Sequence, residues 1–158
     1  MTARISAGLV MCRRRNNQLE FFLVHPGGPF FKNKDLGVWS IPKGLPEGNE
    51  DYLTAAQREF NEETGLKPAG PFHPLGSIKQ KGGKTVYAWT CLGDWDEAHG
   101  IHGNTFTIEW PPKSGRLKEF PEQDKAAWMT LEEAENHIIA EQLPLLQRAI
   151  EYYTSHNF

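Results

Sequence analysis

Apolar runs and polar turns alternate along the first third of the chain. Ser6–Arg13 and Leu19–His25 are rich in aliphatic and aromatic residues, and the polar stretch RNNQ separates them. This pattern predicts two strands joined as a β-hairpin. A loop rich in Gly and Pro follows from His25 to Gly37, and the VWSIP stretch after it predicts another short strand.

The hydrophobic period changes to that of a helix near Asn49, which is a good N-cap residue. Leu53, Ala56 and Phe60 recur at helical spacing, so they predict a stripe that faces the core. Gly65 is the predicted end of this helix, because glycine tolerates the left-handed conformation that often follows the last helical turn.

The middle of the chain returns to strand patterns. Leu75–Gln80 and Lys84–Leu92 predict two strands around the turn KGG, and residues 104–110 alternate as a half-buried strand does. Residues 111–124, rich in proline and charge, predict a long loop with at most one helical turn. The AAWMT stretch that follows predicts a strand.

Two helical segments, LEEAENHI and LLQRAIEYY, end the chain, and Pro144 suits the start of the second. The order of elements is strands, one helix, more strands and then helices. No repeat or linker interrupts it. We therefore predict a single domain over residues 1–158 with an α/β (α+β) fold, a sandwich built on a mixed sheet.

Composition narrows the class of protein. The chain has 158 residues, of which 39% are hydrophobic, and a formal net charge of −3. It lacks the basic excess of a nucleic-acid-binding protein and any apolar run of about 18–20 residues, so we expect neither nucleic acid nor membrane as a partner. Cys12 and Cys91 lie far apart, which favours buried thiols over a disulfide framework. We expect a cytoplasmic location.

Three glutamates crowd into the stretch REFNEETG. Glu59, Glu62 and Glu63 are spaced i, i+3 and i+4, so their carboxylates lie on one helix face. Like charges at this spacing repel by roughly 0.2–0.5 kcal/mol per pair. A solvated charged surface is one interpretation. Clustered carboxylates also suit Mg²⁺, which binds through a few carboxylates together with substrate phosphates.

The surrounding spacing resembles the Nudix box. Five residues separate Gly44 from Glu50, and seven more lead to Arg58–Glu59. The remainder, Phe60 to Leu66, fits hydrophobic–any–Glu–Glu–any–Gly–hydrophobic. The resemblance implies an α/β/α sandwich around a mixed β-sheet. It also implies hydrolysis of a nucleoside diphosphate linked to another group.

The resemblance assigns a role to each box residue. It makes Glu59, Glu62 and Glu63 catalytic ligands of Mg²⁺, for which Mn²⁺ can substitute, and the carbonyl of Lys43 a further ligand. The bound ion would neutralise the diphosphate and lower the pKa of a water. The structural box residues are Gly44, which gives backbone room, the pair Arg58 and Glu50, which pins the loop to the helix, and Gly65, which ends the helix.

A further acid outside the box often serves this family as a metal ligand or general base. Glu119, Glu122 and Asp124 compete for that role. The order of an acid, a short polar stretch and Trp128 resembles asymmetric diadenosine tetraphosphate hydrolases, which favours Glu122 as a catalytic residue and metal ligand. An exposed surface charge is the alternative for each of the three.

The same resemblance suggests dinucleoside polyphosphates as the small-molecule nucleotide substrate. Lys43 and Lys84 are candidates for binding phosphates, and Tyr87, Phe30 and Phe31 for contacting a base. Nucleoside triphosphates or ADP-ribose are alternative substrates, and a non-hydrolytic nucleotide-binding module is an alternative function. The EWPPKSGR stretch has no assigned role, and the oligomeric state stays open between monomer and homodimer.

Overall fold

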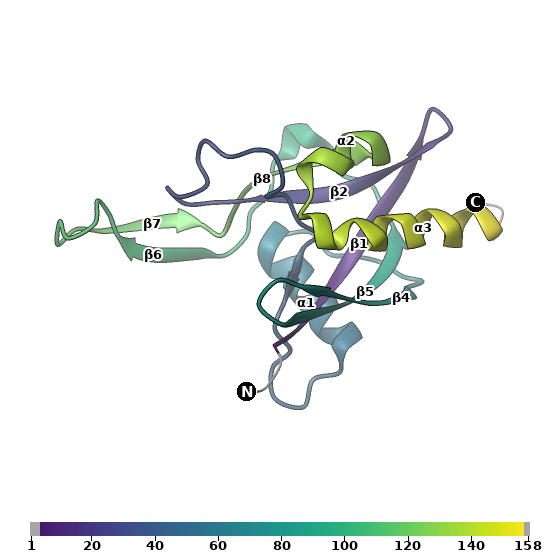
Figure 1. Cartoon of the computed structure of the whole chain (residues 1–158), viewed down its shortest axis with the longest axis horizontal. Helices are drawn as coiled ribbons and strands as arrows, with labels where there is room; N and C mark the ends of the chain where they lie inside the picture. The colour runs from purple at the N-terminus through teal and green to yellow at the C-terminus, as the bar shows by residue number, and fades with distance from the viewer. Residues whose placement is uncertain (1–3, 157–158) are drawn as a thin grey trace.

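A computed structural model describes residues 4–156 of the chain. Its centre is a mixed sheet with strand order β4-β5-β1-β2-β8, and β3 pairs with β1 beside this path (Figure 1). β1 and β5 run parallel, and the other neighbouring strands run antiparallel. The strands are β1 Ile5–Arg15, β2 Gln18–Pro26, β3 Lys43–Gly44, β4 His73–Gln80, β5 Lys84–Leu92 and β8 Gln123–Thr130.

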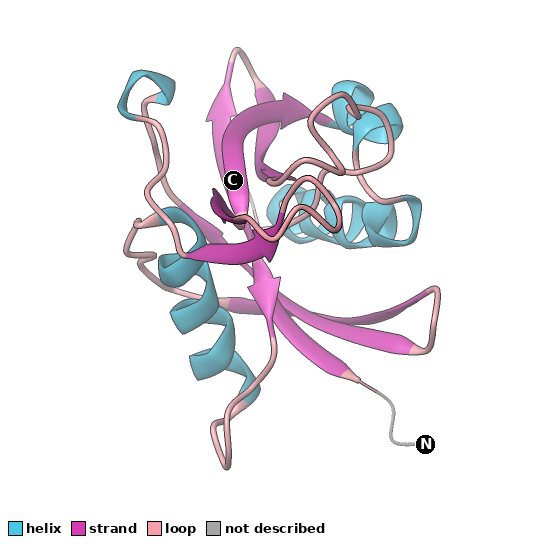
Figure 2. Cartoon of the chain, turned by 90° about the vertical axis from the view of Figure 1, so that its left-hand side faces the viewer, coloured by secondary structure: helices cyan, strands magenta, loops and turns pink. Residues whose placement is uncertain are grey.

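Helices cover both faces of this sheet (Figure 2). Helix α1 (Tyr52–Thr64) lies on one face, and α2 (Leu131–His137) and α3 (Leu143–Ser155) lie on the other. Two short 3₁₀ turns, Glu97–His99 and Ala140–Gln142, complete the helical segments of the described residues. The predicted α/β/α sandwich around a mixed sheet is confirmed.

The alternation of side chains explains why the central strands are apolar throughout. On β1, Leu9 belongs to the core cluster beneath α1, with Phe60, whereas Val10 belongs to the cluster beneath α3, with Leu146. Successive strand residues point to opposite faces, so a strand covered on both sides needs apolar residues at every position. Cys12 and Cys91 are both buried and unpaired, as predicted.

Helix α1 has the predicted core stripe and a corrected start. Asp51, not Asn49, is the N-cap, and its side chain accepts a hydrogen bond from the backbone N–H of Thr54. The helix ends as predicted at Gly65, whose φ of 79° is left-handed. Phe60 is fully buried in the α1-side core.

Two predictions from the loops were wrong. The VWSIP stretch forms isolated bridges at Trp39 and Ser40, and the regular strand begins later, at Lys43. Residues 111–124 were predicted as a loop, but they contain β7 (Leu117–Pro121) and the start of β8. The predicted half-buried strand of residues 104–110 is present as β6 (Thr105–Glu109).

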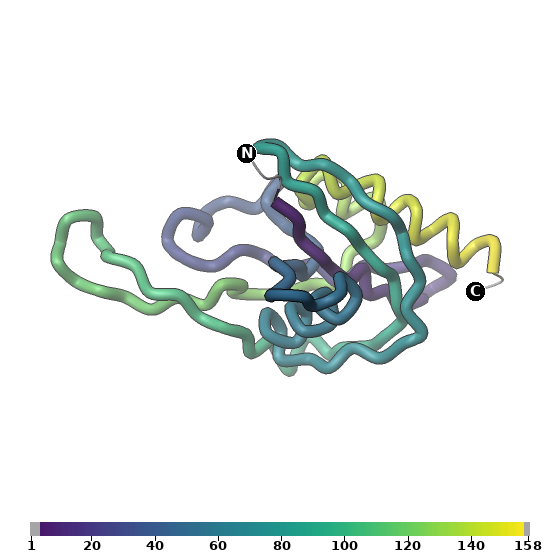
Figure 3. Tube along the Cα trace, turned by 90° about the horizontal axis from the view of Figure 1, so that it is seen from below, coloured from purple at the N-terminus to yellow at the C-terminus, as the bar shows by residue number. Residues whose placement is uncertain are grey.

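β6 and β7 pair with each other as a separate two-stranded ribbon. The ribbon projects from the body of the fold, with the loop of residues 27–37 beside its base (Figures 1 and 3). Within residues 4–156, no helix is long and apolar enough to cross a membrane.

Candidate functional site

The segment from Gly44 to Glu50, which we call the box loop, lies against the face of α1 that carries Glu59, Glu62 and Glu63. Gly44, in β3, pairs with Ala7 of β1 and lies against the side chain of Glu59. Any Cβ at position 44 would collide with the Glu59 carboxylate. A side chain at position 44 would displace the Glu59 carboxylate, because the backbone of β3 lies directly against it.

Arg58 ties the loop to the helix. Its Nε and Nη2 each donate a 2.9 Å hydrogen bond to the two carboxylate oxygens of Glu50, and Nη2 also donates to the carbonyl of Leu45. Its Nη1 donates to Glu59 and Glu62 at 2.8 and 2.9 Å. The carboxylates of Glu50 and Glu59 raise the pKa of Arg58, and the hydrogen bond from Arg58 lowers the pKa of Glu50. The guanidinium offsets the repulsion between Glu59 and Glu62.

Glu63 lies on the inner side of the helix and is only 4% exposed. Its Oε2 accepts a 3.1 Å hydrogen bond from the backbone N–H of Lys43. Burial, together with the neighbouring carboxylates of Glu59 and Glu122, raises the pKa of Glu63 to about 8, against the favourable charge of Lys43. A buried carboxylate that lacks an adequate counter-charge is expensive, and a bound cation would supply that charge.

The start of β8 contributes two more groups. Glu122 acts electrostatically on both Glu59 and Glu63, whose pKa values its charge raises. The next residue, Gln123, donates from Nε2 to Oε1 of Glu63 at 2.9 Å. Sequence reasoning missed Gln123, because a neutral amide in a loop carries no titratable signal.

The other two candidate acids have different partners. Asp124 contacts Nδ1 of buried His25 at 2.8 Å, and Glu119 accepts a hydrogen bond from Thr105 on the ribbon. The structure therefore brings Glu122, and not Glu119, to the box glutamates. Its role there stays a prediction.

In residues 4–156, no three His, Cys, Asp or Glu side chains are already arranged as a metal site. Arg58, the backbone of Lys43 and Gln123 instead take up the oxygens of Glu59, Glu62 and Glu63. The donor chemistry nevertheless fits a hard divalent cation. The charges of Glu59 and Glu122 act on the buried Glu63, whose own charge is poorly compensated, and the glycine backbone of β3 lets the Glu59 carboxylate lie against it.

Lys43 and Lys84 are the two lysines predicted to bind phosphate. Burial lowers the pKa of Lys43, and the positive charge of Lys84 lowers it further. The negative charges of Glu63 and Glu59 act in the opposite direction and raise the pKa of Lys43. Lys84 also lines a cavity of about 520 Å³ between the β4–β5 turn and the segment after α2. Lys84 thus lies near Lys43, and Lys43 lies near Glu63 and Glu59, whereas Lys84 itself lines the cavity beside the segment after α2.

The predicted aromatic contacts fall in two separate places. Tyr87 on β5 aligns with Ala7 and packs against Tyr52 of α1, with ring centroids 5.0 Å apart. Phe30 is 60% exposed on the 27–37 loop, and Phe31 on the same loop lies near Lys34 Nζ, 5.6 Å from its ring centroid. The structure does not gather these three rings around one point.

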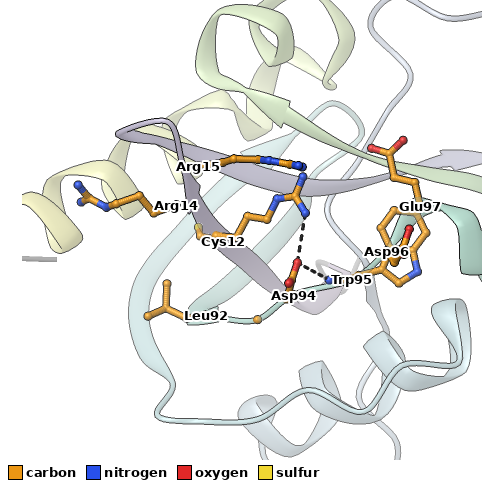
Figure 4. Close-up of a pocket in the computed structure, with 10 residues that line it drawn as sticks. Cys12, Arg14, Arg15, Leu92, Asp94, Trp95, Asp96 and Glu97 are labelled. Carbon is orange, nitrogen blue, oxygen red and sulfur yellow. Dashed lines mark hydrogen bonds and ion pairs between the residues drawn. The ribbon is translucent and has the colours of Figure 1, made fainter.

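A broader cavity of about 1160 Å³ opens at the other end of β1 (Figure 4). Arg13 at this cavity is paired with Glu20 and Asp94 at 2.7 and 3.1 Å. Asp96 and Glu97 line the same opening. Its mixed charge, and its distance along β1 from Ala7 and Gly44, argue against a polyphosphate site there.

Comparisons with known proteins bear on the family and the fold of the chain. A family model described as NUDIX domain matches residues 2–149. A binary complex of a C. elegans Ap4A hydrolase has a TM-score of 0.67 at 23% identity, covering 96% of this chain and 98% of that chain. At this identity, the likeness concerns the fold.

Two curated relatives match over shorter stretches. The mRNA-decapping protein g5R of African swine fever virus (isolate Warthog/Namibia/Wart80/1980) is 59% identical over 29 residues, which cover 18% of this chain and 12% of the viral protein. Nudix hydrolase 7 of Arabidopsis thaliana is 36% identical over 62 residues, covering 39% of this chain and 21% of the plant protein. The chain thus spans a small part of either relative.

Proposed function

The chain belongs to the Nudix family, and on that premise we propose that it hydrolyses pyrophosphate bonds in a Mg²⁺-dependent reaction. The substrate we propose is a dinucleoside polyphosphate. The observation that carries the proposed metal-dependent hydrolysis is the buried carboxylate of Glu63, on which the charges of Glu59 and Glu122 act. Glu59 lies against the glycine backbone of β3.

In this proposal the reacting diphosphate binds at the acidic cluster. Glu59, Glu63 and Glu122 would hold the cation. Glu62 lies next to Glu59, because Arg58 Nη1 donates to both carboxylates, and would be close to the cation as well. When bound, Mg²⁺ neutralises the diphosphate and makes a water a better nucleophile at neutral pH. Mn²⁺ carries the same charge and would substitute.

The chain's own residues supply the remaining functions. Arg58 holds the loop and the carboxylates in place through its contacts with Glu50, Leu45 and Glu59. Lys43 brings positive charge next to Glu63 and Glu59, and Lys84 lies close enough to act on Lys43. We propose that both lysines contact the polyphosphate chain. The carboxylate of Glu122, whose charge acts on Glu59 and Glu63, is proposed to bind the cation or to accept a proton from the attacking water.

A substrate panel tests the proposal. Diadenosine tetraphosphate, its guanosine analogue, ATP, ADP-ribose and a diphosphoinositol phosphate are compared at equal concentration, with Mg²⁺ and with EDTA. We expect diadenosine tetraphosphate to be cleaved fastest, with weak discrimination between bases, and EDTA to abolish turnover. If ATP or ADP-ribose were cleaved about ten times faster, the dinucleotide assignment would fall while the Nudix chemistry stood.

Two matched variants test the site within the same panel. Glu122→Gln should reduce turnover, whereas Glu119→Gln should not, because Glu119 lies on the ribbon and bonds to Thr105. A chain that binds nucleotides in Mg²⁺ but cleaves none of them would support the non-hydrolytic alternative.

A further inference from the structure

The ribbon of β6 and β7 has one aromatic and cationic face. Its register pairs Phe106 with Phe120 and Ile108 with Lys118. Directly opposed residues of an antiparallel pair point to the same side, so these four side chains share a face. Trp110 follows Ile108 at the strand period and continues this face toward the tip.

This face of the ribbon packs against the 27–37 loop. The ring of Phe30 meets that of Trp110 edge to face, with centroids 5.4 Å apart. Gly28 lies close under Phe106, since a Cβ there would stand 2.7 Å from the ring. Figures 1 and 3 show the loop beside the base of the ribbon from two directions.

Between loop and ribbon lies a cavity of about 300 Å³, which we call the ribbon cavity. Trp110 and Phe120 supply aromatic walls, Lys32 and Lys118 supply positive charge, and Asp124 lies at its inner end. This volume is at the lower end of the range for ligand sites, about 300–1,000 Å³. It suits one nucleoside with a phosphate rather than a whole dinucleotide.

The backbone holds the ribbon cavity in fixed register with the acidic cluster. The N–H of Gly27 donates to the carbonyl of Glu122 at 2.8 Å, and the N–H of Glu122 donates to the carbonyl of Asn104 at 2.9 Å. The N–H of Asn104 in turn donates to the carbonyl of Glu62 at 2.8 Å. Buried His25 bonds both Asp124 and the carbonyl of Lys34, which fixes the far end of the loop.

The ribbon cavity lies on the Glu122 side of the acidic cluster. Pro121 and Asp124, which line the cavity, are close to Glu122 in the chain. β3 pairs with Ala7 and Gly8 along the edge of β1 opposite β5, so Lys43 lies on the same side of β1 as β2 and β8. A phosphate chain bound at the acids and Lys43 would reach the ribbon cavity past Glu122, so the nucleoside at its end would meet the aromatic walls.

We propose that the ribbon cavity binds the second nucleoside of the substrate, with its base against Trp110 and the nearest phosphate between Lys32 and Lys118. The identity of the whole substrate rests on the proposed function. The affinity of the cavity for a nucleoside monophosphate is independent of the proposed function, because the aromatic and cationic groups of the cavity lie outside the acidic cluster.

Binding without metal tests the cavity by itself. AMP is titrated into ¹⁵N-labelled protein in EDTA, and the indole N–H signals of the five tryptophans are followed. The Trp110 signal is identified by its loss in Trp110→Phe. We expect AMP to shift this signal in a saturable way while the signals of buried Trp95 and Trp128 stay in place.

Inorganic phosphate provides the control ligand. A Trp110 signal that AMP does not move would overturn the proposal. An equal, saturable shift with phosphate alone would also overturn it, since the cavity would then be an anion site without a place for the base.

Kinetics on the same ribbon give an independent test. Trp110→Ala should raise the KM for diadenosine tetraphosphate by about 5- to 100-fold, the range for removing one aromatic stacking partner. Its kcat and the hydrolysis of ATP should change by less than about twofold. The control is Leu117→Ala, because Leu117 is 75% exposed and pairs with Glu109 on the opposite face.

The outcomes separate this inference from the proposed function. Equal effects of Trp110→Ala and Leu117→Ala, with Mg²⁺-dependent hydrolysis intact, would refute the ribbon cavity alone. An AMP-dependent shift of Trp110 in a protein that hydrolyses nothing would support the ribbon cavity and refute the hydrolase. Lys118→Met, which removes one charge and keeps Trp110, should weaken AMP binding several-fold and so checks the result if Trp110→Ala misfolds.

Discussion

The side-chain amide of Gln123 donates a 2.9 Å hydrogen bond to Oε1 of Glu63, joining the start of β8 to the inner side of α1. Glu63 Oε2 accepts from the backbone of Lys43 in the same way. The buried carboxylate is therefore held from both sides. Its orientation depends on segments that lie far from it in the sequence.

Gln123→Ala should weaken divalent metal binding by about 10-fold, because groups that orient a ligand typically contribute 10- to 100-fold to affinity. Calorimetric titration with Mn²⁺ measures this directly. Gln123 is a positioning residue: it orients the Glu63 carboxylate through its hydrogen bond and does not itself bind the metal. An unchanged Mn²⁺ affinity with normal folding would show that the hydrogen bond is purely structural.

Glu63→Gln should separate chemistry from stability. We expect turnover to fall by about 100-fold or more, since one anionic oxygen ligand of the cation is lost. Unfolding in urea without metal should change by less than about 1 kcal/mol, because the amide keeps the size and shape of the carboxyl group. Full activity of this variant on the substrate panel would rule out a catalytic role for Glu63.

Phe60→Ala should have the opposite effect. Phe60 is fully buried and packs against Phe22, with ring centroids 5.5 Å apart. Its loss should cost roughly 3–5 kcal/mol in the free energy of unfolding, measured in urea. Leu53→Ala, on the half-buried side of the same stripe, is the control and should cost less. Comparable losses would mean that the helix is rotated from the position described.

The fold was predictable from sequence where local patterns and the global structure agree. The hairpin of β1 and β2, the end of α1 at Gly65 and the position of Pro144 in the first turn of α3 all follow from local residue chemistry. The N-cap was misplaced because Asn49 and Asp51 are both good caps. Tertiary contacts decided between them, since Glu50 is taken by Arg58.

The ribbon was the main feature that sequence reasoning missed. Pro111 and Pro112 lie at its tip, and β7 carries Lys118 and Glu119, so residues 111–124 lack the alternation of a half-buried strand. The strand forms through backbone pairing with β6 over its whole length, and Glu119 also accepts a hydrogen bond from Thr105 across the ribbon. Among the candidate acids, Glu122 was favoured by resemblance, whereas its place beside Glu63 depends on non-local pairing of β8 with β2.

The thiols of Cys12 and Cys91 should be inert in the folded protein. Burial raises the pKa of both to about 12. An unfolded thiol ionises near pH 8.5, so its reaction with a disulfide reagent accelerates between pH 7 and 9. The folded protein should show no such acceleration, because its thiols stay protonated throughout that range. Rapid labelling of native protein at pH 8 would contradict this packing, and urea should release both thiols as the positive control.

The most direct measurement is anomalous diffraction from crystals soaked in Mn²⁺. The account predicts a peak about 2.1 Å from carboxylate oxygens of Glu59 and Glu63, near the distance typical of Mg²⁺, with Glu62 and Glu122 bound directly or through one water. The Arg58 contacts to Glu59 and Glu62 should lengthen as the ion takes those oxygens. A peak at any other place, or carboxylates of Glu59 and Glu62 that stay on Arg58 at saturating Mn²⁺, would contradict this metal site.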